Sequence, residues 1–161
     1  MFNVIARTAF ALGSASLPLV AFASASGTCT SGEDSLTLVD GTIFKTPNDS
    51  APKKETIVVE LASIKLDASK VKAATDPEDE VRKQVWAADH AGQVRLTMRD
   101  GTLTELYAHV PLGHNINRSG GTALGEIKLS RSDAKGAAGH FTIKGKANDD
   151  LSCDLSFDLN Y

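Results

Sequence analysis

The last eleven residues of the chain, 151-LSCDLSFDLNY-161, contain the pattern that decides the fold. Apolar residues occupy every second position of this stretch, and polar residues fill the positions between them. Because the side chains of a strand point alternately to its two faces, the stretch predicts a β-strand with one buried face. It also contains Cys153, and the only other cysteine of the chain is Cys29. A disulfide between the two would tie the last strand to the N-terminal part of the fold.

The first 25 residues have the features of a signal peptide. A single basic residue, Arg7, precedes an apolar run from Ala9 to Ala23, and Ala23-Ser24-Ala25 has the small-residue pattern of a cleavage site. The run is short for the ~20 residues that span a bilayer, which makes an uncleaved anchor the lesser alternative. The sequence therefore predicts a leader at 1–25 and one exported β domain at 26–161. We expect this domain to be periplasmic or secreted, with no membrane insertion after the leader is removed.

Compartment and charge restrict the chemistry and the partners. Two cysteines in an exported protein most simply pair, so a disulfide between Cys29 and Cys153 is predicted. The chain has 17 basic and 20 acidic residues, a formal net charge of −3, and no acidic residue in the leader. Nucleic-acid binding depends on basic surfaces that neutralise phosphates. Nucleic acid is therefore not an expected partner.

Alternating segments between turn signals predict a mainly β fold. Asp40-Gly41 lies between two such segments and predicts a hairpin. From Gln93 onward the pattern is typical of an antiparallel meander, whose expected strands are 93–99, 102–110, 123–131, 139–146 and 151–161. The expected architecture is an antiparallel β-sandwich or partly open barrel of seven to eight strands.

One helix is expected to interrupt the strands, over about residues 76–91. Asp76-Pro77 supplies an N-cap acid followed by proline at the first helical position, and further acids follow near the positive end of the helix dipole. Val81 and Val85, one turn apart, give the helix a buried stripe. Trp86 lies beside this stripe, and we interpret it as an anchor of the helix on the sheet, with a ligand-stacking role as the alternative.

The hairpin at Asp100-Gly101 decides which side chains of the following strand face outward. A tight two-residue turn would place Glu105 opposite Leu96 on the apolar face, whereas a bulge at Gly101 places Glu105 opposite Arg95. The second register is the expected one, because it pairs opposite charges. It leaves three side chains on the face away from the core: Leu103, Tyr107 and His109.

The twelve residues from Pro111 to Thr122, PLGHNINRSGGT, are largely turn formers and predict a long loop. Loops of this length are often functional or mobile, and this one follows directly after the outward-facing end of a strand. Tyrosine and arginine are common in protein interfaces. The predicted binding residues are Tyr107, His109, His114, Asn115, Asn117 and Arg118.

No motif in the sequence indicates a catalytic, metal or cofactor site. His109 and His114 lie close in sequence, but a metal site needs three or four convergent ligands, and the sequence leaves open whether His90 or His140 reaches them. The exported part has no Gly-x-Ser-x-Gly motif, and it has no free cysteine if the disulfide forms. Gly120-Gly121 lacks the lysine and the following helix of a phosphate-binding loop. We therefore expect neither an enzyme nor a bound metal or cofactor.

The expected function is non-enzymatic binding of another protein in the bacterial envelope or secreted space. A small exported β domain with one disulfide is similar in size and layout, though in no motif, to periplasmic inhibitors of lytic enzymes, so an inhibitor or immunity-type protein is the leading hypothesis. The first alternative is a small-ligand-binding protein or minor hydrolase with a pocket inside the β layers. The second is an outer-membrane β-barrel, because the alternating apolar residues before Tyr161 resemble the terminal strand of that class.

Overall fold

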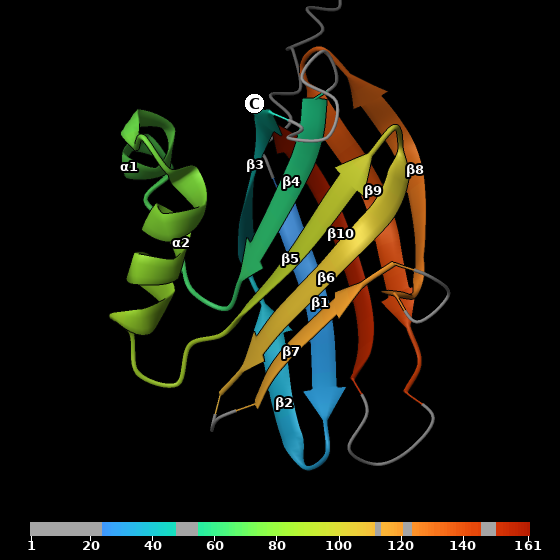
Figure 1. The fold of residues 1–161 in the computed structure, drawn as a ribbon. Helices are drawn as coiled ribbons and strands as arrows, with labels where there is room; N and C mark the ends of the chain where they lie inside the picture. The colour runs from blue at the N-terminus through green and yellow to red at the C-terminus, as the bar shows by residue number, and fades with distance from the viewer. Residues whose placement is uncertain (1–23, 48–54, 112–113, 121–123, 146–150) are drawn as a thin grey trace, which may run out of the picture.

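The structure is a computed structural model that describes residues 24–47, 55–111, 114–120, 124–145 and 151–161. These residues form two antiparallel sheets of five strands that pack face to face, with two short helices beside one of them (Figure 1). The predicted sandwich is therefore confirmed, and the described chain has ten strands where seven to eight were expected.

The two sheets are named by their place in Figure 1. The back sheet has the order β2 (Asp34–Leu38), β1 (Ser24–Ser31), β10 (Ser152–Asn160), β9 (Gly136–Ile143) and β8 (Glu126–Asp133). The front sheet has the order β3 (Asp40–Pro47), β4 (Glu55–Ala62), β5 (Gln93–Arg99), β6 (Thr102–Val110) and β7 (His114–Ser119). The helices are α1 (Ala68–Ala73) and α2 (Pro77–Trp86).

The stretch that decides the fold forms β10, the central strand of the back sheet. β10 pairs with β1 on one side and with β9 on the other. Its apolar residues point into the space between the sheets, where Leu155 is fully buried and Phe157 is 4% exposed. The alternating pattern thus gives one core face and one wet face, as predicted.

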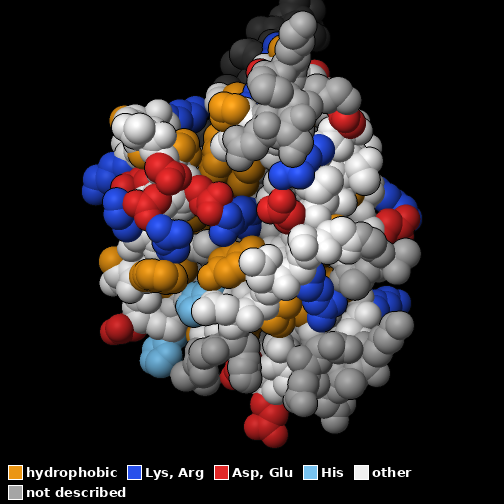
Figure 2. Space-filling view, viewed as in Figure 1, with side chains coloured by type: hydrophobic (Ala, Val, Ile, Leu, Met, Phe, Trp, Pro, Cys, Tyr) orange, Lys and Arg blue, Asp and Glu red, His pale blue; other side chains and the backbone are white. Residues whose placement is uncertain are grey.

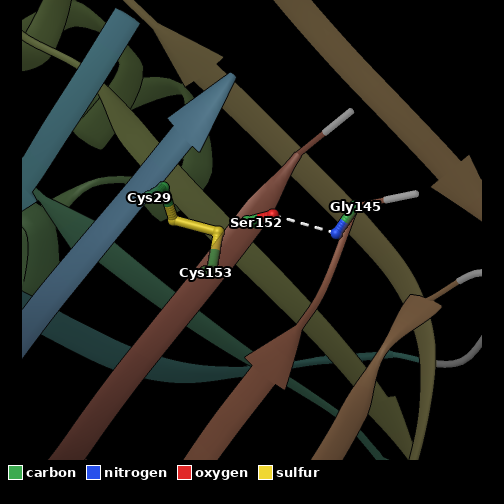
Figure 3. The surroundings of a disulfide bond; sticks show 4 residues. All are labelled: Cys29, Gly145, Ser152 and Cys153. Atoms are coloured by element: carbon green, nitrogen blue, oxygen red, sulfur yellow. Dashed lines mark hydrogen bonds between the residues drawn. A yellow bond between two sulfur atoms is a disulfide. The ribbon is translucent and has the colours of Figure 1, made fainter. Parts of the chain in front are cut away.

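Cys29 of β1 lies directly opposite Cys153 of β10, with 4.1 Å between their Cα atoms, and the two form the predicted disulfide (Figure 3). Beside it, the hydroxyl of Ser152 accepts a hydrogen bond from the backbone N–H of Gly145, which follows β9. The disulfide therefore covalently joins two neighbouring strands that are 124 residues apart in sequence.

β1 begins within the predicted leader. Its first two residues, Ser24 and Ala25, pair with Asp158 and Phe157 of β10, and Ala25 is 6% exposed. Cleavage after Ala25 would remove both residues from the strand. Residues 1–23, which make up the rest of the predicted leader, lie outside the described residues.

The helical segment is close to the predicted one but shorter. Asp76 caps α2 by accepting a hydrogen bond from the Asp79 backbone N–H, at 3.0 Å, and Pro77 opens the helix. α2 ends at Trp86 and not at residue 91, because the chain turns away through His90, whose φ is 56°. α1 is an additional single-turn helix that the sequence did not predict. Both helices contribute to a second apolar cluster on the outside of the front sheet.

The predicted hairpin at Asp40-Gly41 is wrong. Asp40 begins β3, so the chain crosses here from the back sheet to the front sheet. The carboxylate of Asp40 accepts hydrogen bonds from the backbone N–H groups of Gly41 and of Leu66, each at 2.9 Å. A Cβ at Gly41 would lie 2.9 Å from the carbonyl oxygen of Glu60. This glycine therefore serves close strand packing and not a turn.

The β5–β6 hairpin has a tight turn, and the predicted register of Glu105 is wrong. Asp100 and Gly101 both have positive φ, as a two-residue turn requires, and the bulge lies further in, where the hydroxyl of Thr104 donates to the Thr97 carbonyl. Glu105 consequently lies opposite Thr97 and pairs with Arg99 at 3.1 Å. Of the three side chains predicted to face outward, the prediction for Leu103 is wrong, because it is 9% exposed and joins the core. Tyr107 and His109 do lie on the outer face.

The predicted long loop contains a strand. Residues 114–119 form β7, which pairs with β6 from Glu105↔Ser119 to Val110↔His114. Ile116 packs against the core, and its neighbours Asn115 and Asn117 are exposed. The sequence predicted a loop here because asparagine and serine, which are common in turns, make up much of this short strand and obscure its alternating pattern. Residues 112–113 and 121–123 of the predicted loop lie outside the described residues.

Removal of the disulfide should be costly. We expect a Cys29→Ala/Cys153→Ala double variant to lose about 4 kcal/mol of unfolding free energy, because the crosslink restricts a very long loop in the unfolded chain. Urea unfolding of the oxidised protein and of the variant measures the difference. The reduced wild-type protein is the control and should unfold near the midpoint of the variant; equal midpoints for the oxidised protein and the variant would contradict the expectation.

Candidate functional site

Two rows of side chains cross the outer face of the front sheet, the face turned away from the back sheet. The first row consists, in strand register, of Glu60, Arg95, Tyr107 and Asn117. The second consists of Ala62, Gln93, His109 and Asn115. Burial falls steadily along both rows from β4, which lies under the helices, to the exposed edge strand β7.

Glu60 forms the buried end of the first row. Its carboxylate is fully buried, and its Oε1 atom lies 3.2 Å from Nε of Arg95. Arg95 also pairs with Glu78 of α2, so it joins the sheet to the helix that covers it. Burial raises the pKa of Glu60 to about 8 and outweighs the opposing effect of Arg95, which lowers it. This carboxyl is therefore mostly protonated at neutral pH.

Gln93 is the buried polar residue of the second row. Its side chain is 0% exposed, and neither of its amide atoms has a hydrogen-bond partner among the described residues. Unpaired buried amides are costly to stability. The buried part of this face thus contains a polar side chain beside the apolar cluster that holds α2.

Tyr107, His109 and Asn115 form a hydrogen-bonded group at the centre of the face. The hydroxyl of Tyr107 donates to Oδ1 of Asn115 at 3.2 Å, and Nδ1 of His109 lies 2.8 Å from the same oxygen. Because a carbonyl oxygen only accepts, Nδ1 of His109 carries the proton. The guanidinium of Arg95 lies over the Tyr107 ring, 5.0 Å from its centroid. Partial burial raises the pKa of Tyr107, so its hydroxyl stays protonated and able to donate.

The structure brings four of the six predicted binding residues together and places a fifth, Arg118, on the opposite face. Tyr107, His109, Asn115 and Asn117 share the outer face, since they are direct neighbours across β6 and β7. Arg118 lies opposite Leu106 and so on the inner face of β7. The backbone of His114 pairs with Val110, and its side chain lies outside the described residues.

A cleft of ≈ 340 Å³ lies beside this group, between the end of α2 and β6. Its lining residues are Val85, Trp86, Ala88, His90, Ala91, His109 and Pro111. Figure 2 shows hydrophobic and histidine side chains gathered at the lower left of this view, below the charged side chains of the helical region. The structure thus answers the question left open by the sequence, because His90 reaches the neighbourhood of His109.

Trp86 is not the anchor that the sequence suggested. Its side chain is 62% exposed, and the guanidinium of Arg82 lies 5.5 Å from the centre of its ring. Val81 and Val85, which are fully buried, hold α2 to the sheet instead. Trp86 was absent from the predicted binding residues, although a tryptophan beside the buried stripe of an amphipathic helix was the available signal.

Two structural findings restrict the chemistry. The described residues contain no group of three or more His, Cys, Asp and Glu side chains that could hold a metal ion. Neither α1 nor α2 has the length and apolar character of a transmembrane helix.

Comparisons with protein-family models, with curated proteins and with solved structures find no match to this chain.

The raised pKa of Glu60 predicts a pH-dependent stability. The folded state binds more protons than the unfolded state between pH 4.5 and about 8, so stability falls as the pH rises through this window. A Glu60→Gln variant removes this titration. We expect it to match the wild-type protein near pH 4.5 and to be more stable by on the order of 3 kcal/mol at pH 8.5.

Urea unfolding at the two pH values checks this expectation. Glu105→Gln is the matched control, because its carboxylate lies on the same sheet but is 44% exposed. The control should show no comparable gain at high pH. A wild-type stability that rises from pH 5 to 8 by more than that of Glu60→Gln would contradict the assignment.

Proposed function

We propose that this protein is a small exported binding protein without enzymatic activity, which engages another protein through the outer face of β6 and β7 and the free edge of β7. Within this class, an inhibitor or immunity-type protein of the bacterial envelope is the leading candidate. The disulfide supports an oxidising compartment, and the ordered polar group on an otherwise open face supports a binding role.

The observation that carries the proposal is the direction of the backbone groups of β7. The N–H of Gly120 donates to the carbonyl of Thr104, in the same register that continues through β7. In an antiparallel ladder, hydrogen-bonded pairs alternate with pairs whose backbone groups point away. Residues 114, 116 and 118 therefore bond to β6, and the N–H and C=O groups of Asn115, Asn117 and Ser119 point outward from the edge.

Such an edge accepts a strand from a partner. An incoming extended segment would bond to the backbone of β7 and place alternate side chains beside Asn115 and Asn117, next to the Tyr107–His109 group. Main-chain hydrogen bonds supply affinity in this mode, and the neighbouring side chains supply specificity.

β7 is less protected than the edge strands β3 and β8. β3 ends in Pro47, and β8 has a bulge between Leu129 and Arg131 together with alternating charged residues. These are the usual means by which proteins prevent edge pairing. β7 has no proline, lysine or acidic residue, and its register with β6 is unbroken. Its one arginine, Arg118, lies on the inner face, where it restricts which strands can be added.

Photo-crosslinking tests the location of binding. A photoreactive amino acid replaces Asn117 in the tagged, exported protein, and the same replacement at Lys128 of β8 is the control, since that side chain is 73% exposed on the other sheet. We expect one defined protein adduct from position 117 in the native compartment and none from position 128. Equal labelling at both positions, or no adduct at 117, would refute a partner site on this face.

Proline substitution tests the mode of binding. Asn117→Pro removes an outward N–H without breaking a bond to β6, whereas Asn117→Ala removes the side chain and keeps that N–H. We expect capture of the crosslinked partner to fall about tenfold or more in the proline variant and less than about threefold in the alanine variant. Similar losses in both variants would show that the side chain, and not strand addition, mediates binding.

A further inference from the structure

The cleft at the end of α2 contains the only tryptophan of the chain. Trp86 keeps 62% of its surface exposed although it lies next to the fully buried Val85. Arg82, one turn earlier on α2, stacks on the indole and steadies it. A large aromatic surface is thus held in water at the rim of a cleft, a position that packing of the helix does not require.

His90 lines the same cleft from a strained backbone. Its φ of 56° lies in the left-handed region, which is costly for residues other than glycine. Strained residues tend to persist where the strain places a functional side chain. A glycine at this position after a helix would form the turn without strain. The requirements of the turn therefore do not by themselves account for an imidazole at position 90.

His109, on the opposite wall of the cleft, is fixed in one tautomer. Its Nδ1–H donates to Oδ1 of Asn115, and the same oxygen accepts from Tyr107. The neutral ring then has its lone pair on Nε2, which makes this atom a hydrogen-bond acceptor. His109 and Trp86 both line the cleft, so its lining includes an imidazole with an acceptor nitrogen and an indole ring.

The remaining lining excludes several ligand classes. The residues that line the cleft include no Lys, Arg, Asp or Glu, so nothing in the lining neutralises an ionic ligand. The apolar part of the lining consists of the Trp86 indole, Pro111 and the small side chains of Val85, Ala88 and Ala91. A volume of ≈ 340 Å³ is at the lower end of the range for ligand sites and admits one or two rings.

We propose that this cleft binds a neutral, polyhydroxylated ring, the chemistry of a sugar residue of a glycan. The C–H face of such a ring packs on the indole of Trp86, and its hydroxyl groups donate to Nε2 of His109 and exchange hydrogen bonds with His90. The site shares His109 with the outer face proposed for the partner, but its other ligand contacts come from α2 and the turn after it and not from the β7 edge.

Intrinsic fluorescence tests the proposal directly, since Trp86 is the sole tryptophan. The probes are maltose, lactose and N,N′-diacetylchitobiose, added to the whole exported protein at up to about 20 mM, because ligands of one or two rings bind in the millimolar range. We expect a saturable shift of the emission with at least one of the three. No saturable change with any of them would overturn the proposal.

Variants separate binding from folding. We expect His109→Ala to weaken binding about threefold to tenfold, and His140→Ala on the back sheet, where the imidazole contacts Ser156, to leave it unchanged. Asn115 acts as a positioning residue, so Asn115→Ala should weaken binding. Unchanged affinity in both His109→Ala and Asn115→Ala would overturn the assignment of His109.

The His90→Gly variant distinguishes a loss of sugar binding from a loss of folding. Glycine relieves the left-handed backbone at this position, so the thermal midpoint should be unchanged or higher while sugar binding falls. Indole and benzoate serve as competing probes. Saturable binding of either one without any sugar binding would show an ordinary apolar or anionic site and overturn the proposal. Loss of protein capture in Asn117→Pro bears on the β7 edge alone, so the two proposals fail separately.

Discussion

The pairing of β1 with β10 is the constraint on which the rest of the structure depends. It places the first and the last described strands side by side at the centre of the back sheet and fixes them with the Cys29–Cys153 disulfide. With these positions taken, the middle of the chain from Asp40 to Ser119 forms the whole of the front sheet and both helices. Strands that follow one another in sequence are antiparallel neighbours in the front sheet, so no connection has to cross over the sheet.

Sequence patterns predicted the elements whose order is set locally. The period-two pattern of residues 151–161 and the start of α2 at Asp76-Pro77 were both recognisable, because alternation and capping depend on neighbouring residues. Asp40-Gly41 misled because its carboxylate is satisfied by the backbone of Leu66, 26 residues later. The segment of β7 was predicted to be a loop because asparagine and serine favour turns locally, while pairing with β6 overrides that preference.

The candidate site was partly predictable for the same reason. Tyr107 and His109 follow from the outward parity of β6, and Asn115 and Asn117 join them only once β7 is a strand. Trp86 and His90 could not be placed, because their position depends on where α2 ends and on which strands the helix covers. The burial of Glu60 was equally hidden, since no local pattern shows that a helix lies over that position.

The outer face combines two requirements that conflict. α2 needs an apolar surface beneath Val81 and Val85, and the exposed half of the same face needs polar groups. The registers of β4, β5 and β6 place Glu60, Arg95 and Tyr107 in one row, so a buried acid lies two strands from a proposed binding residue. Arg95 reconciles them, because it contacts Glu60, pairs with Glu78 on α2 and stacks on Tyr107. A shift of α2 would therefore change the support of Tyr107 through Arg95, and a ligand at Trp86 on that helix would act on the same contacts as a partner at β7.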